Sequence, residues 1–411
     1  MTIMKLKLLL MCLAYLLADL VRYPRRSRSL LRTLQKQKDR TENKAMGWVD
    51  FLLLTYLPQR YLRRTKYVHY ASSPSIIKKL AVVYGNYPKQ APSQAEVCPT
   101  SELTLTLKPK ILIIRKNAMG DVILTTPAIR EMYEDRGGFC EIYVATDFPA
   151  LFELNPYVKQ AFKIEELSFT GCQFDHIIDL DMAYERNKNT HVVDVYGFYC
   201  SGRPPRNPQP FIASSDLRLE NLPSLQSHGN EADNIRTIVV HNRKDPTQPY
   251  RGLNPGIWTE IMNDIPRIAS EATDEISIKI YTIGTRPFDM HVDNTCSYDL
   301  RDSLSVRDTK TLIEKSDLFI GIDAGPLHLA ASTDTPIVAL YTHVNPEFYS
   351  PRRTSSQLKI KNFAANIECS GCASRYPIPW GFHCERGDFA CTGRFSKSAI
   401  MSTIEKLLLN D

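Results

Sequence analysis

Hydrophobic and polar positions follow a new pattern along this chain once Pro109 is passed. Short apolar runs rich in β-branched residues then alternate with segments of helical periodicity, and the first run is Lys110–Arg115 (KILIIR). Continuous apolar runs of this length are typical of strands buried on both faces of a parallel sheet. A loop, KNAMGD, and a helical pattern over Val122–Tyr133 follow. Strand, glycine-containing loop and helix in this order predict an α/β domain.

The alternation occurs in two sets. The first set predicts further strands at Glu141–Ala145 and Asp175–Leu180 and a helix near Val192–Cys200. A stretch rich in Pro and polar residues, Arg203–Asn234, then interrupts the pattern. The strands expected in the second set are Thr237–His241, Ile276–Ile283, Leu318–Ile322 and Ile337–Tyr341, and its helices are expected near Gly256–Asp264, Thr309–Lys315 and Leu327–Ser332. Two doubly wound halves would place a ligand in the cleft at the carboxyl ends of their strands.

Composition is that of an ordinary globular protein, with 43% hydrophobic and 23% charged residues among 411. It excludes a collagen, a coiled coil and a wholly disordered chain. We expect three regions: a basic amphipathic helical extension and linker (1–100), a first α/β domain (101–234) and a second α/β domain that includes the carboxyl-terminal cysteines (235–411).

The first hundred residues differ from the rest in charge. They contain 18 Lys and Arg against 5 Asp and Glu, a net charge of +13, whereas the remainder carries −7 of the overall +6. A basic extension on a slightly acidic body indicates a partner with an anionic surface.

Two apolar segments in this extension are each followed by arginines. The uninterrupted run from Leu8 to Ala18 is shorter than the about 20 residues that span a bilayer, and no signal-peptide cleavage site follows it. The second segment is Trp48–Leu57. Both are typical of amphipathic helices on an anionic membrane surface. Packing against the body is the alternative, and nucleic acid is the least favoured partner.

Asp121 is the first candidate for chemistry. It follows Gly120, which permits a tight turn after a strand, and it stands at the start of a predicted helix. A carboxylate in this place could act as general base on an acceptor hydroxyl. It could equally cap the helix by accepting a backbone N–H bond.

A second candidate is the loop GIDAGPLHLAA, residues 321–331. It follows a buried strand and opens a helix through Gly325 and Pro326, so backbone N–H groups and the positive helix end could bind a diphosphate. His328 could donate to a phosphate or could simply pack within the helix. The chain has no GxGxxG or GKS element, which disfavours a dinucleotide site or a P-loop.

Four of the ten cysteines lie within 23 residues near the carboxyl end. Cys369, Cys372, Cys384 and Cys391 have a tight first pair, and Gly371 permits the turn between its members. This spacing favours a structural four-thiolate metal site in a reducing compartment, with His383 as a less favoured substitute ligand. Reduced cysteines and a disulfide are the alternatives.

Two stretches of this sequence, ILIIRKNAMGDVILTTPAIR and IEKSDLFIGIDAGPLHLAASTDTPIVALY, resemble the signature regions of glycosyltransferase family 9, the bacterial heptosyltransferases of lipopolysaccharide cores. The likeness extends roughly over Lys110–Ile400. It implies a GT-B fold of two Rossmann-like halves and an inverting transfer that needs no catalytic metal. It also implies a nucleotide-diphospho-sugar donor, typically ADP-heptose, held mainly by the second half. Residues 101–234 would then form the Rossmann-like acceptor domain, and residues 235–411 the Rossmann-like nucleotide-sugar domain.

The resemblance also assigns residues. Asp121 matches the acidic residue proposed as the base in the family. The diphosphate-binding loop of the family corresponds to Asp323, Ala324, Gly325, Pro326 and His328, with Ala324 where the family often has Ser or Thr. Some relatives hold zinc or iron at cysteines in the terminal region, which agrees with the metal site suggested above.

A basic residue that neutralises the leaving diphosphate in the family has its nearest match at Arg251. Arg243 or Lys244 could serve instead. Thr342, His343 and Tyr349 lie in a loop that replaces a Gly-Pro-Thr-rich segment of the family, and they are further candidates for donor contact.

The sequence thus predicts an inverting glycosyltransferase that moves a sugar, heptose from ADP-heptose, onto a lipopolysaccharide core or a related cell-surface glycolipid. It would work in the cytoplasm, as a peripheral protein of the bacterial inner membrane. One alternative is a protein O-glycosyltransferase or O-heptosyltransferase acting on Ser or Thr of a surface protein. Another is an inactive scaffold that binds a sugar nucleotide.

Deletion of residues 1–67 tests the predicted membrane contact. Because the basic amphipathic segments supply the expected attraction to anionic lipid, the shortened protein should move from the membrane to the soluble fraction on cell fractionation. Unchanged membrane retention would contradict this function of the extension.

Overall fold

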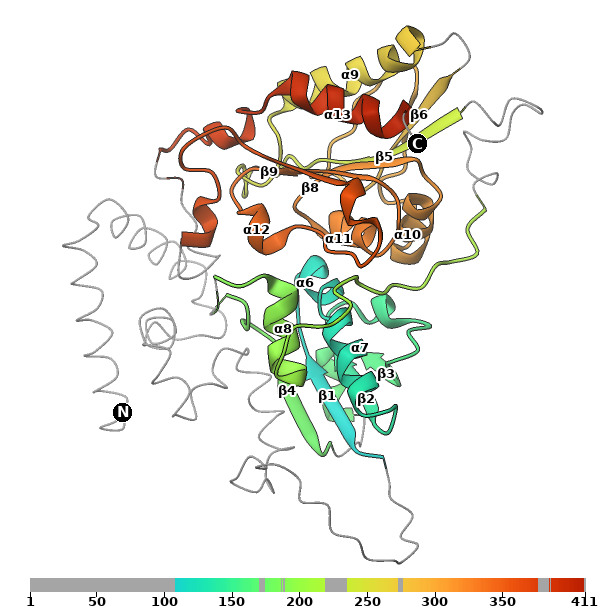
Figure 1. Ribbon diagram of the computed structural model, residues 1–411, viewed down its shortest axis with the longest axis vertical. Coiled ribbons are helices and arrows are strands. Elements are labelled where there is room, and N and C mark those ends of the chain that lie inside the picture. Colours follow the sequence, from blue (N-terminus) through green and yellow to red (C-terminus); the bar gives the residue numbers. More distant parts are fainter. Residues whose placement is uncertain are drawn as a thin grey trace, which may run out of the picture. The chain divides into compact units, whose positions relative to one another are not determined.

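The computed structural model describes residues 108–169, 174–185, 187, 189–218, 235–272, 276–375, 384 and 386–409 (Figure 1). The extension and linker predicted for residues 1–100 lie outside the described residues. The chain divides into two compact units, which are described separately below. Among the described residues, the first unit holds residues 108–116, 133–147 and 157–181, and the second unit holds residues 117–132, 148–156 and those from 182 onward.

The first unit contains a parallel sheet of four strands in the order β3-β2-β1-β4. The strands are β1 (Lys110–Ile114), β2 (Glu141–Ala145), β3 (Gln160–Phe162) and β4 (His176–Asp179). Ile111, Leu112, Ile113 and Ile114 are all at most 1% exposed. Burial of consecutive residues means that both faces of β1 are covered, as its unbroken apolar sequence predicted.

The second unit contains a parallel sheet of six strands in the order β10-β9-β8-β5-β6-β7. The strands are β5 (Ile235–His241), β6 (Ser277–Thr282), β7 (Ser297–Asp299), β8 (Leu318–Ile322), β9 (Ile337–Tyr341) and β10 (Ile360–Ala364). Every residue of β8 and β9 is buried. The predicted α/β class with two parallel sheets is thus confirmed.

In each sheet the strand that comes first in the sequence, β1 or β5, lies inside the sheet. The next strands are added on one side of it, and the later strands are added on its other side. The order therefore reverses between β1 and β4 in the first sheet and between β5 and β8 in the second. Loops that leave two neighbouring strands in opposite directions open a crevice at the carboxyl edge of the sheet, where α/β proteins bind ligands. Asp323 follows β8 directly, at the reversal point of the second sheet.

Eight α-helices occur among the described residues. They are α6 (Met119–Ile123), α7 (Thr126–Asp135), α8 (Val192–Ser201), α9 (Pro255–Ala272), α10 (Val306–Glu314), α11 (Gly325–Ala331), α12 (Pro346–Tyr349) and α13 (Lys397–Leu409). Short 3-10 turns are η2 (Pro149–Phe152), η3 (Ile164–Phe169), η6 (Ser356–Lys359), η7 (Cys372–Arg375) and η9 (Ala390–Thr392).

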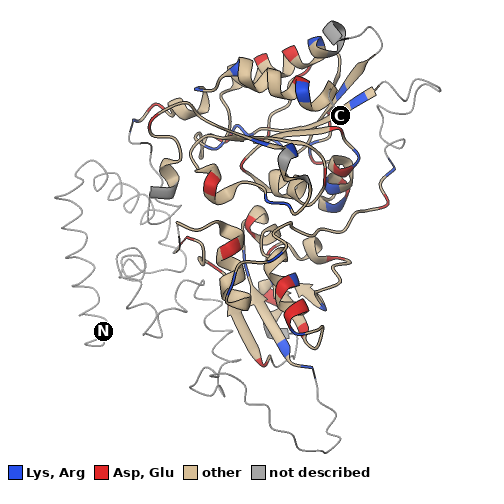
Figure 2. Ribbon diagram, in the orientation of Figure 1, with Lys and Arg blue, Asp and Glu red and all other residues tan. Residues whose placement is uncertain are grey.

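The helices α9 and α13 contact each other and share one hydrophobic core with the second sheet (Figure 1). Ile400, Ile404 and Leu408 recur every fourth residue on α13, so they lie on one face and are buried there. Trp258 of α9 is 1% exposed in the same core. Both acidic and basic residues occur along the two helices (Figure 2). Lys397 of α13 and Asp264 of α9 form an ion pair, with 2.8 Å between their charged atoms.

The single helix predicted over Val122–Tyr133 is wrong in one respect, because two helices occupy this stretch. The chain leaves α6 after Ile123 and enters α7 at Thr126. Pro127 explains the break, since proline has no N–H for a helical bond and is tolerated only in a first turn. Thr125 and Thr126 donate their hydroxyls to backbone carbonyls of α6 and so stabilise the junction.

The sequence analysis did not predict the strands β3, β7 and β10 or the helix α13. β3 and β7 have three residues each, and β10 is an edge strand with exposed positions, so their sequences lack a clear alternation. Helix α13 does carry a readable apolar period.

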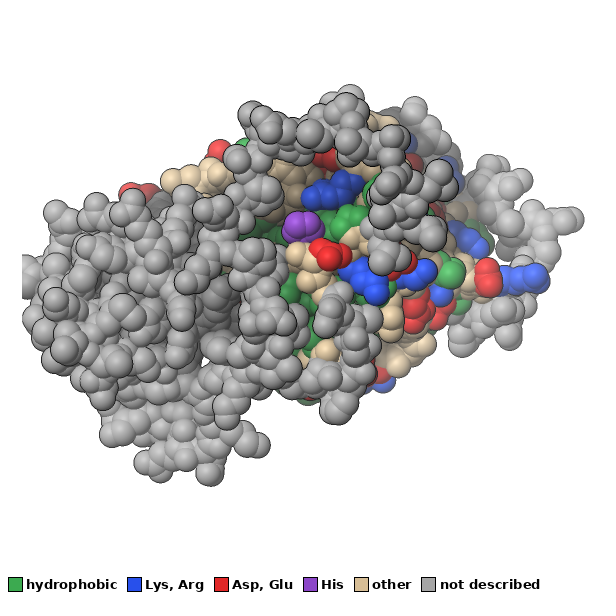
Figure 3. Space-filling view, turned by 90° about the horizontal axis from the view of Figure 1, so that it is seen from below, with side chains coloured by type: hydrophobic (Ala, Val, Ile, Leu, Met, Phe, Trp, Pro, Cys, Tyr) green, Lys and Arg blue, Asp and Glu red, His purple; other side chains and the backbone are tan. Residues whose placement is uncertain are grey.

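Within the part of the chain that the structure describes, no helix has the length and apolar character needed to cross a membrane. Seen from below the orientation of Figure 1, the described surface mixes basic, acidic and hydrophobic side chains around a histidine (Figure 3).

Candidate active site

The loop after β8 leads directly into helix α11. Ala324 is the residue before the helix and Pro326 lies in its first turn. Because alanine has no side-chain acceptor and proline has no N–H, the start of α11 is not capped by its own sequence as most helices are. Backbone N–H groups here are therefore suited to an anionic ligand.

Helix α6 packs directly on α11, within the second unit. A methyl group placed on Gly120 would lie 2.7 Å from Cδ2 of His328 and 3.6 Å from Cα of Gly325. The first distance is shorter than carbon–carbon contact, about 3.5–4.0 Å. A methyl group on Gly325 would in turn meet the side chain of Met119. Glycine at both positions therefore lets the two helices approach.

Asp121 is the third residue of α6 and is half-buried. Its Oδ2 accepts a hydrogen bond of 3.2 Å from the backbone N–H of Ala118, which precedes the helix. The capping contact expected as an alternative function is thus present. The function of Asp121 as a general base stays a prediction, because one carboxylate can both cap a helix and accept a proton.

Asp323 lies beside His328, with 3.6 Å between Oδ1 and Nε2. Burial acts to raise the pKa of Asp323, but the interaction with His328 and the positive charge of Arg251 outweigh it and bring the pKa below its ordinary value. Asp323 is therefore ionised at neutral pH, and its carboxylate lies beside the ring of His328, the fourth residue of α11.

Two of the three basic residues considered for the diphosphate, Arg251 and Arg243, have different surroundings. Arg251 acts electrostatically on Asp323 and on His343, so it lies in the neighbourhood of the α11 loop. Arg243 pairs with Asp245, with 3.1 Å between Nη2 and Oδ2. Arg251 is therefore the candidate whose charge acts on Asp323, the first residue of the α11 loop.

Two of the further candidates, Thr342 and His343, follow β9 and are buried. The Thr342 hydroxyl donates to the backbone carbonyl of Tyr250, and the His343 ring meets the Tyr250 ring edge-on with centroids 4.7 Å apart. Burial, together with the charge of Arg251, lowers the pKa of His343 to about 3. His343 is therefore neutral at physiological pH, and it packs against Tyr250, the residue before Arg251.

Tyr349 ends α12, and the ring of Tyr184 meets it at 5.8 Å. Burial raises the pKa of the Tyr349 hydroxyl, and the negative charges of Asp323, Asp121 and Glu185 add to this effect. The phenol therefore remains protonated and can donate a hydrogen bond. Glu185 was not considered from the sequence, because no recognised spacing relates it to Asp121.

A pair of polar contacts holds the loop after α12 against α8. His191 Nδ1 accepts from the N–H of Val193 at 3.2 Å, so Nε2 carries the proton and donates to the carbonyl of Ser350 at 2.9 Å. Arg352 binds the Asp194 carboxylate through two contacts of 2.8 Å. These contacts fix the backbone on the carboxyl side of Tyr349.

The four candidate metal ligands gather in one region. None forms a disulfide, and Cys384 and Cys391 are buried. Burial raises the pKa of Cys391 to about 12, and Cys372, Cys384 and Cys369 contribute in the same direction through their negative charges. Gly371 has φ of +71°, which permits the turn that Cys372 closes by donating its N–H to the carbonyl of Cys369.

In the described residues no three or more His, Cys, Asp or Glu side chains form a group with a geometry suited to a metal ion. The four thiols therefore lie close enough to affect one another electrostatically, but their geometry is not that of a metal coordination shell.

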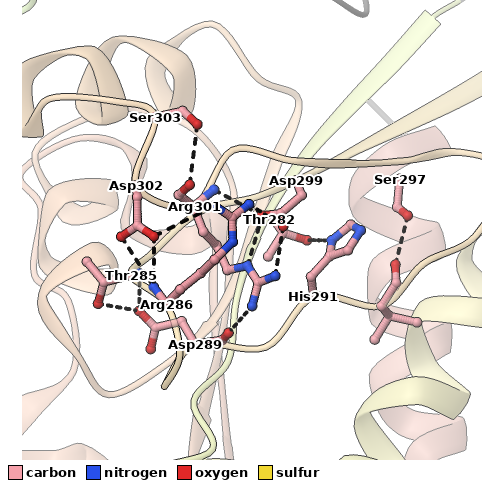
Figure 4. A network of polar contacts seen from close by, with 11 residues as sticks. Thr282, Thr285, Arg286, Asp289, His291, Ser297, Asp299, Arg301, Asp302 and Ser303 are labelled. Carbon is pink, nitrogen blue, oxygen red and sulfur yellow. Dashed lines mark hydrogen bonds and ion pairs between the residues drawn. The ribbon is translucent and has the colours of Figure 1, made fainter.

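An arginine and aspartate network at the carboxyl ends of β6 and β7 was missed by sequence reasoning (Figure 4). Asp299 accepts from Arg286 at 2.8 Å and from Arg301 at 2.7 Å, and the backbone N–H of Arg286 donates to Asp302 at 3.1 Å. The hydrogen bond from Arg301 outweighs burial and, with that from Arg286, lowers the pKa of Asp299 far below its ordinary value. The network fixes two loops on the same edge of the sheet as the α11 loop.

A comparison with protein families matches residues 290–376 to the model of Glycosyltransferase family 9 (heptosyltransferase). This segment includes the loop after β8, helix α11 and Tyr349. This segment of the chain is therefore similar to glycosyltransferase family 9, and the match indicates an enzyme that transfers a sugar from a nucleotide sugar. A comparison with curated proteins gave no match.

Solved structures of family 9 proteins support the GT-B-like fold. A family 9 glycosyltransferase from Veillonella parvula is 16% identical, with a TM-score of 0.56 over 76% of this chain and 100% of that one. The iron-containing dodecameric glycosyltransferase TibC from enterotoxigenic E. coli is 15% identical, with a TM-score of 0.53 over 74% of this chain and 77% of that one. A second TibC structure, in complex with ADP-D-beta-D-heptose, gives 0.52 at 15% identity over the same shares.

Replacement of His191 by Gln should make the stability of the protein less sensitive to acid. Burial, together with the charge of Arg352, lowers the pKa of His191 to about 4, whereas an unfolded histidine titrates near about 6.5. Between these values only the unfolded state binds the proton, so this contribution to stability is complete above about pH 6.5 and is lost as the pH falls toward 4.

The measurement is thermal unfolding from pH 7 to 4.5 in the wild type, His191→Gln and the exposed control His176→Gln. The melting temperature should fall less steeply in His191→Gln than in the other two proteins. Asp181, whose pKa burial and Asp179 raise to about 6, titrates in the same window but is common to all three. Equal slopes in all three proteins would show that His191 does not stay neutral when buried.

Proposed function

We propose that this glycosyltransferase transfers heptose from ADP-heptose to a hydroxyl of a lipopolysaccharide core or related glycolipid, with inversion at the anomeric carbon. The donor assignment is supported by similarity of fold to TibC, a heptosyltransferase whose structure holds ADP-D-beta-D-heptose. The assignment of an inverting reaction rests on the resemblance of the two signature regions to the family.

The observation that carries the proposal is the contact of α6 with α11. Gly120 touches His328, so Asp121, the next residue, stands beside the helix start suited to the donor diphosphate. A base and a diphosphate site must lie a few ångströms apart when one displacement joins acceptor and donor. Packing of the two helices supplies that proximity without a loop that has to close.

The reaction we propose is a single displacement. Asp121 takes the proton of the acceptor hydroxyl, and the oxygen forms a bond to the anomeric carbon of the donor. The bond from that carbon to the diphosphate oxygen breaks, and the nucleoside diphosphate leaves with the electron pair. The backbone N–H groups at the start of α11 and the Arg251 guanidinium would stabilise the negative charge that develops on it.

The acceptor admits a second candidate, a Ser or Thr hydroxyl of a surface protein. The Tyr349 phenol, the Asp121 carboxylate and Glu185 lie in one neighbourhood, and this set can hydrogen-bond a neutral hydroxyl on a sugar or on a protein equally well. Location at the inner membrane is supported by the charge of residues 1–100 alone. Retention of Asp121 and of the complete loop from Asp323 to His328 disfavours the inactive scaffold.

Replacement of Asp121 by Asn should abolish turnover and leave donor binding intact. General-base catalysis contributes roughly 10²–10⁴-fold, and an amide cannot take the proton. The panel consists of ADP-, GDP-, UDP- and CDP-sugars. Thermal stabilisation should be selective for ADP-heptose in both the wild type and Asp121→Asn, while product formation falls only in the variant. The anomeric configuration of the product, read by NMR, should be inverted relative to the donor.

A matched control is Asp216→Asn, which changes an exposed carboxylate in a described stretch away from α6. It should keep full activity. Full turnover in Asp121→Asn would remove the base assignment, and stabilisation by another nucleotide sugar would change the donor. Radiolabel transfer to truncated lipopolysaccharide cores, compared with transfer to surface proteins, decides between the two acceptors.

We also propose that Cys369, Cys372, Cys384 and Cys391 hold a structural zinc or iron. The proposal is supported by their shared neighbourhood, by the turn at Gly371 and by the fold similarity to TibC, which is described as iron-containing. A bound cation would favour the thiolate forms, which neighbouring negative charge otherwise disfavours. Four thiolates leave no open coordination position, so the metal would brace the segment and take no part in sugar transfer.

Metal analysis of protein purified under reducing conditions tests the site. We expect about one zinc or iron per chain in the wild type, because four thiolates complete a tetrahedral shell. Cys391→Ser should lose most of this metal, whereas Cys296→Ser, outside the cluster, should keep it. A wild-type protein without metal, even after incubation with Zn²⁺ or Fe²⁺, would contradict the site and leave the cysteines as reduced thiols.

A further inference from the structure

The cysteine-containing segment packs on the loops of the candidate active site. The backbone N–H of Ala373 donates to the carbonyl of His343 at 2.9 Å. A methyl group on Gly371 would lie 3.1 Å from Cβ of Asn345, the residue before α12. The first part of the segment, residues 369–375, therefore lies against the chain that connects β9 to Tyr349.

The second part of the segment, residues 386–392, contacts the loop that carries Arg251. The ring of Phe389 lies against the ring of Tyr250, with centroids 6.3 Å apart and planes at 34°. The backbone N–H of Asn254 donates to the carbonyl of Thr392 at 2.8 Å. Arg251 thus lies in a loop, residues 250–254, whose two ends both contact this part of the segment.

The Arg251 loop is also held from other directions. The Thr342 hydroxyl donates to the carbonyl of Tyr250, and the His343 ring packs edge-on against the Tyr250 ring, which Phe389 also contacts. A methyl group on Gly252 would collide with the backbone carbonyl of Arg243. The backbone on either side of Arg251 is therefore restricted by Tyr250 and Gly252, which fixes the direction in which its side chain leaves the loop.

Phe389 has an unusual backbone conformation. Its φ is +48°, in the left-handed region that glycine tolerates and large side chains rarely adopt. Residues persist in such conformations when the surrounding structure holds them there, and they are concentrated at functional sites. Because the Phe389 ring contacts Tyr250, the strained backbone indicates that the position of this ring beside Tyr250 has a function.

We propose that Phe389 is a positioning residue of the donor site, which holds Tyr250 and through it directs the Arg251 guanidinium toward the donor diphosphate. The inference rests on the proposed function, in which Arg251 binds the diphosphate of the donor. It gives the cysteine-containing segment a part in donor affinity in addition to bracing the end of the chain. Phe389 itself touches neither substrate nor reacting atoms.

The test compares the affinity for ADP and for adenosine, by calorimetry, in Phe389→Gly, Phe389→Asn, Phe389→Tyr and Arg251→Gln. Gly and Asn both tolerate a positive φ, so they remove the ring without adding backbone strain. Phe389→Tyr keeps the ring and should restore wild-type affinity. Glu368→Ala is the matched control, because it changes an exposed residue directly before the same segment.

ADP affinity should fall roughly tenfold to a hundredfold in Phe389→Gly, Phe389→Asn and Arg251→Gln, the loss expected when a charged group no longer reaches its phosphate. Adenosine, which has no phosphate, should bind to all of the variants with wild-type affinity. The double variant Phe389→Gly with Arg251→Gln should bind ADP no more weakly than Arg251→Gln alone, because both changes act through one contact.

Wild-type ADP affinity in folded Phe389→Gly and Phe389→Asn, or additive losses in the double variant, would overturn the positioning function while Arg251→Gln still identifies a diphosphate site. A general loss of folding would instead weaken ADP and adenosine binding alike, which also overturns it. A wild type that binds no nucleoside diphosphate or nucleotide sugar would overturn the proposed function itself.

Discussion

The close approach of α6 to α11 is the constraint on which the proposed active site depends. At Gly120 the backbone of one helix touches the His328 ring of the other, and any side chain on residue 120 would occupy space that the ring already fills. Asp121 follows at once in the sequence, so its distance from the α11 loop is set by helix packing. Packed interiors resist small displacements, which makes this a firm way to hold a base beside a diphosphate site.

Charge in the site is set by burial and by a small number of partners. His191 and His343 are neutral because burial disfavours their charged forms, and Tyr349 keeps its proton beside the carboxylates. Asp323 is ionised because His328 and Arg251 compensate for its burial. In the proposed function, positive charge near the leaving group would come from Arg251 and from the start of α11.

The loops at the carboxyl edge of the second sheet are each fixed by side chains, because the hydrogen bonds of the strands end there. The Arg286, Asp299 and Arg301 network secures the loops after β6 and β7. Tyr250 and His343 secure the loops after β5 and β9, with the cysteine-containing segment against them. Precise orientation of a bound donor requires such support, since a ligand held by loose loops loses the benefit of proximity.

The sequence by itself determined the buried parallel strands, the glycine-containing loops and the candidate residues Asp121 and Asp323 to His328, because apolar runs and loop chemistry are local properties. Only the tertiary structure decided that Arg251, rather than Arg243, lies near Asp323, and that Glu185 and Tyr349 share the neighbourhood of Asp121. It also decided that Phe389 lies on Tyr250. These residues are far apart along the chain, and their contacts follow from which strands are neighbours in the sheet, a choice made by the packing of the whole core and not by any single segment.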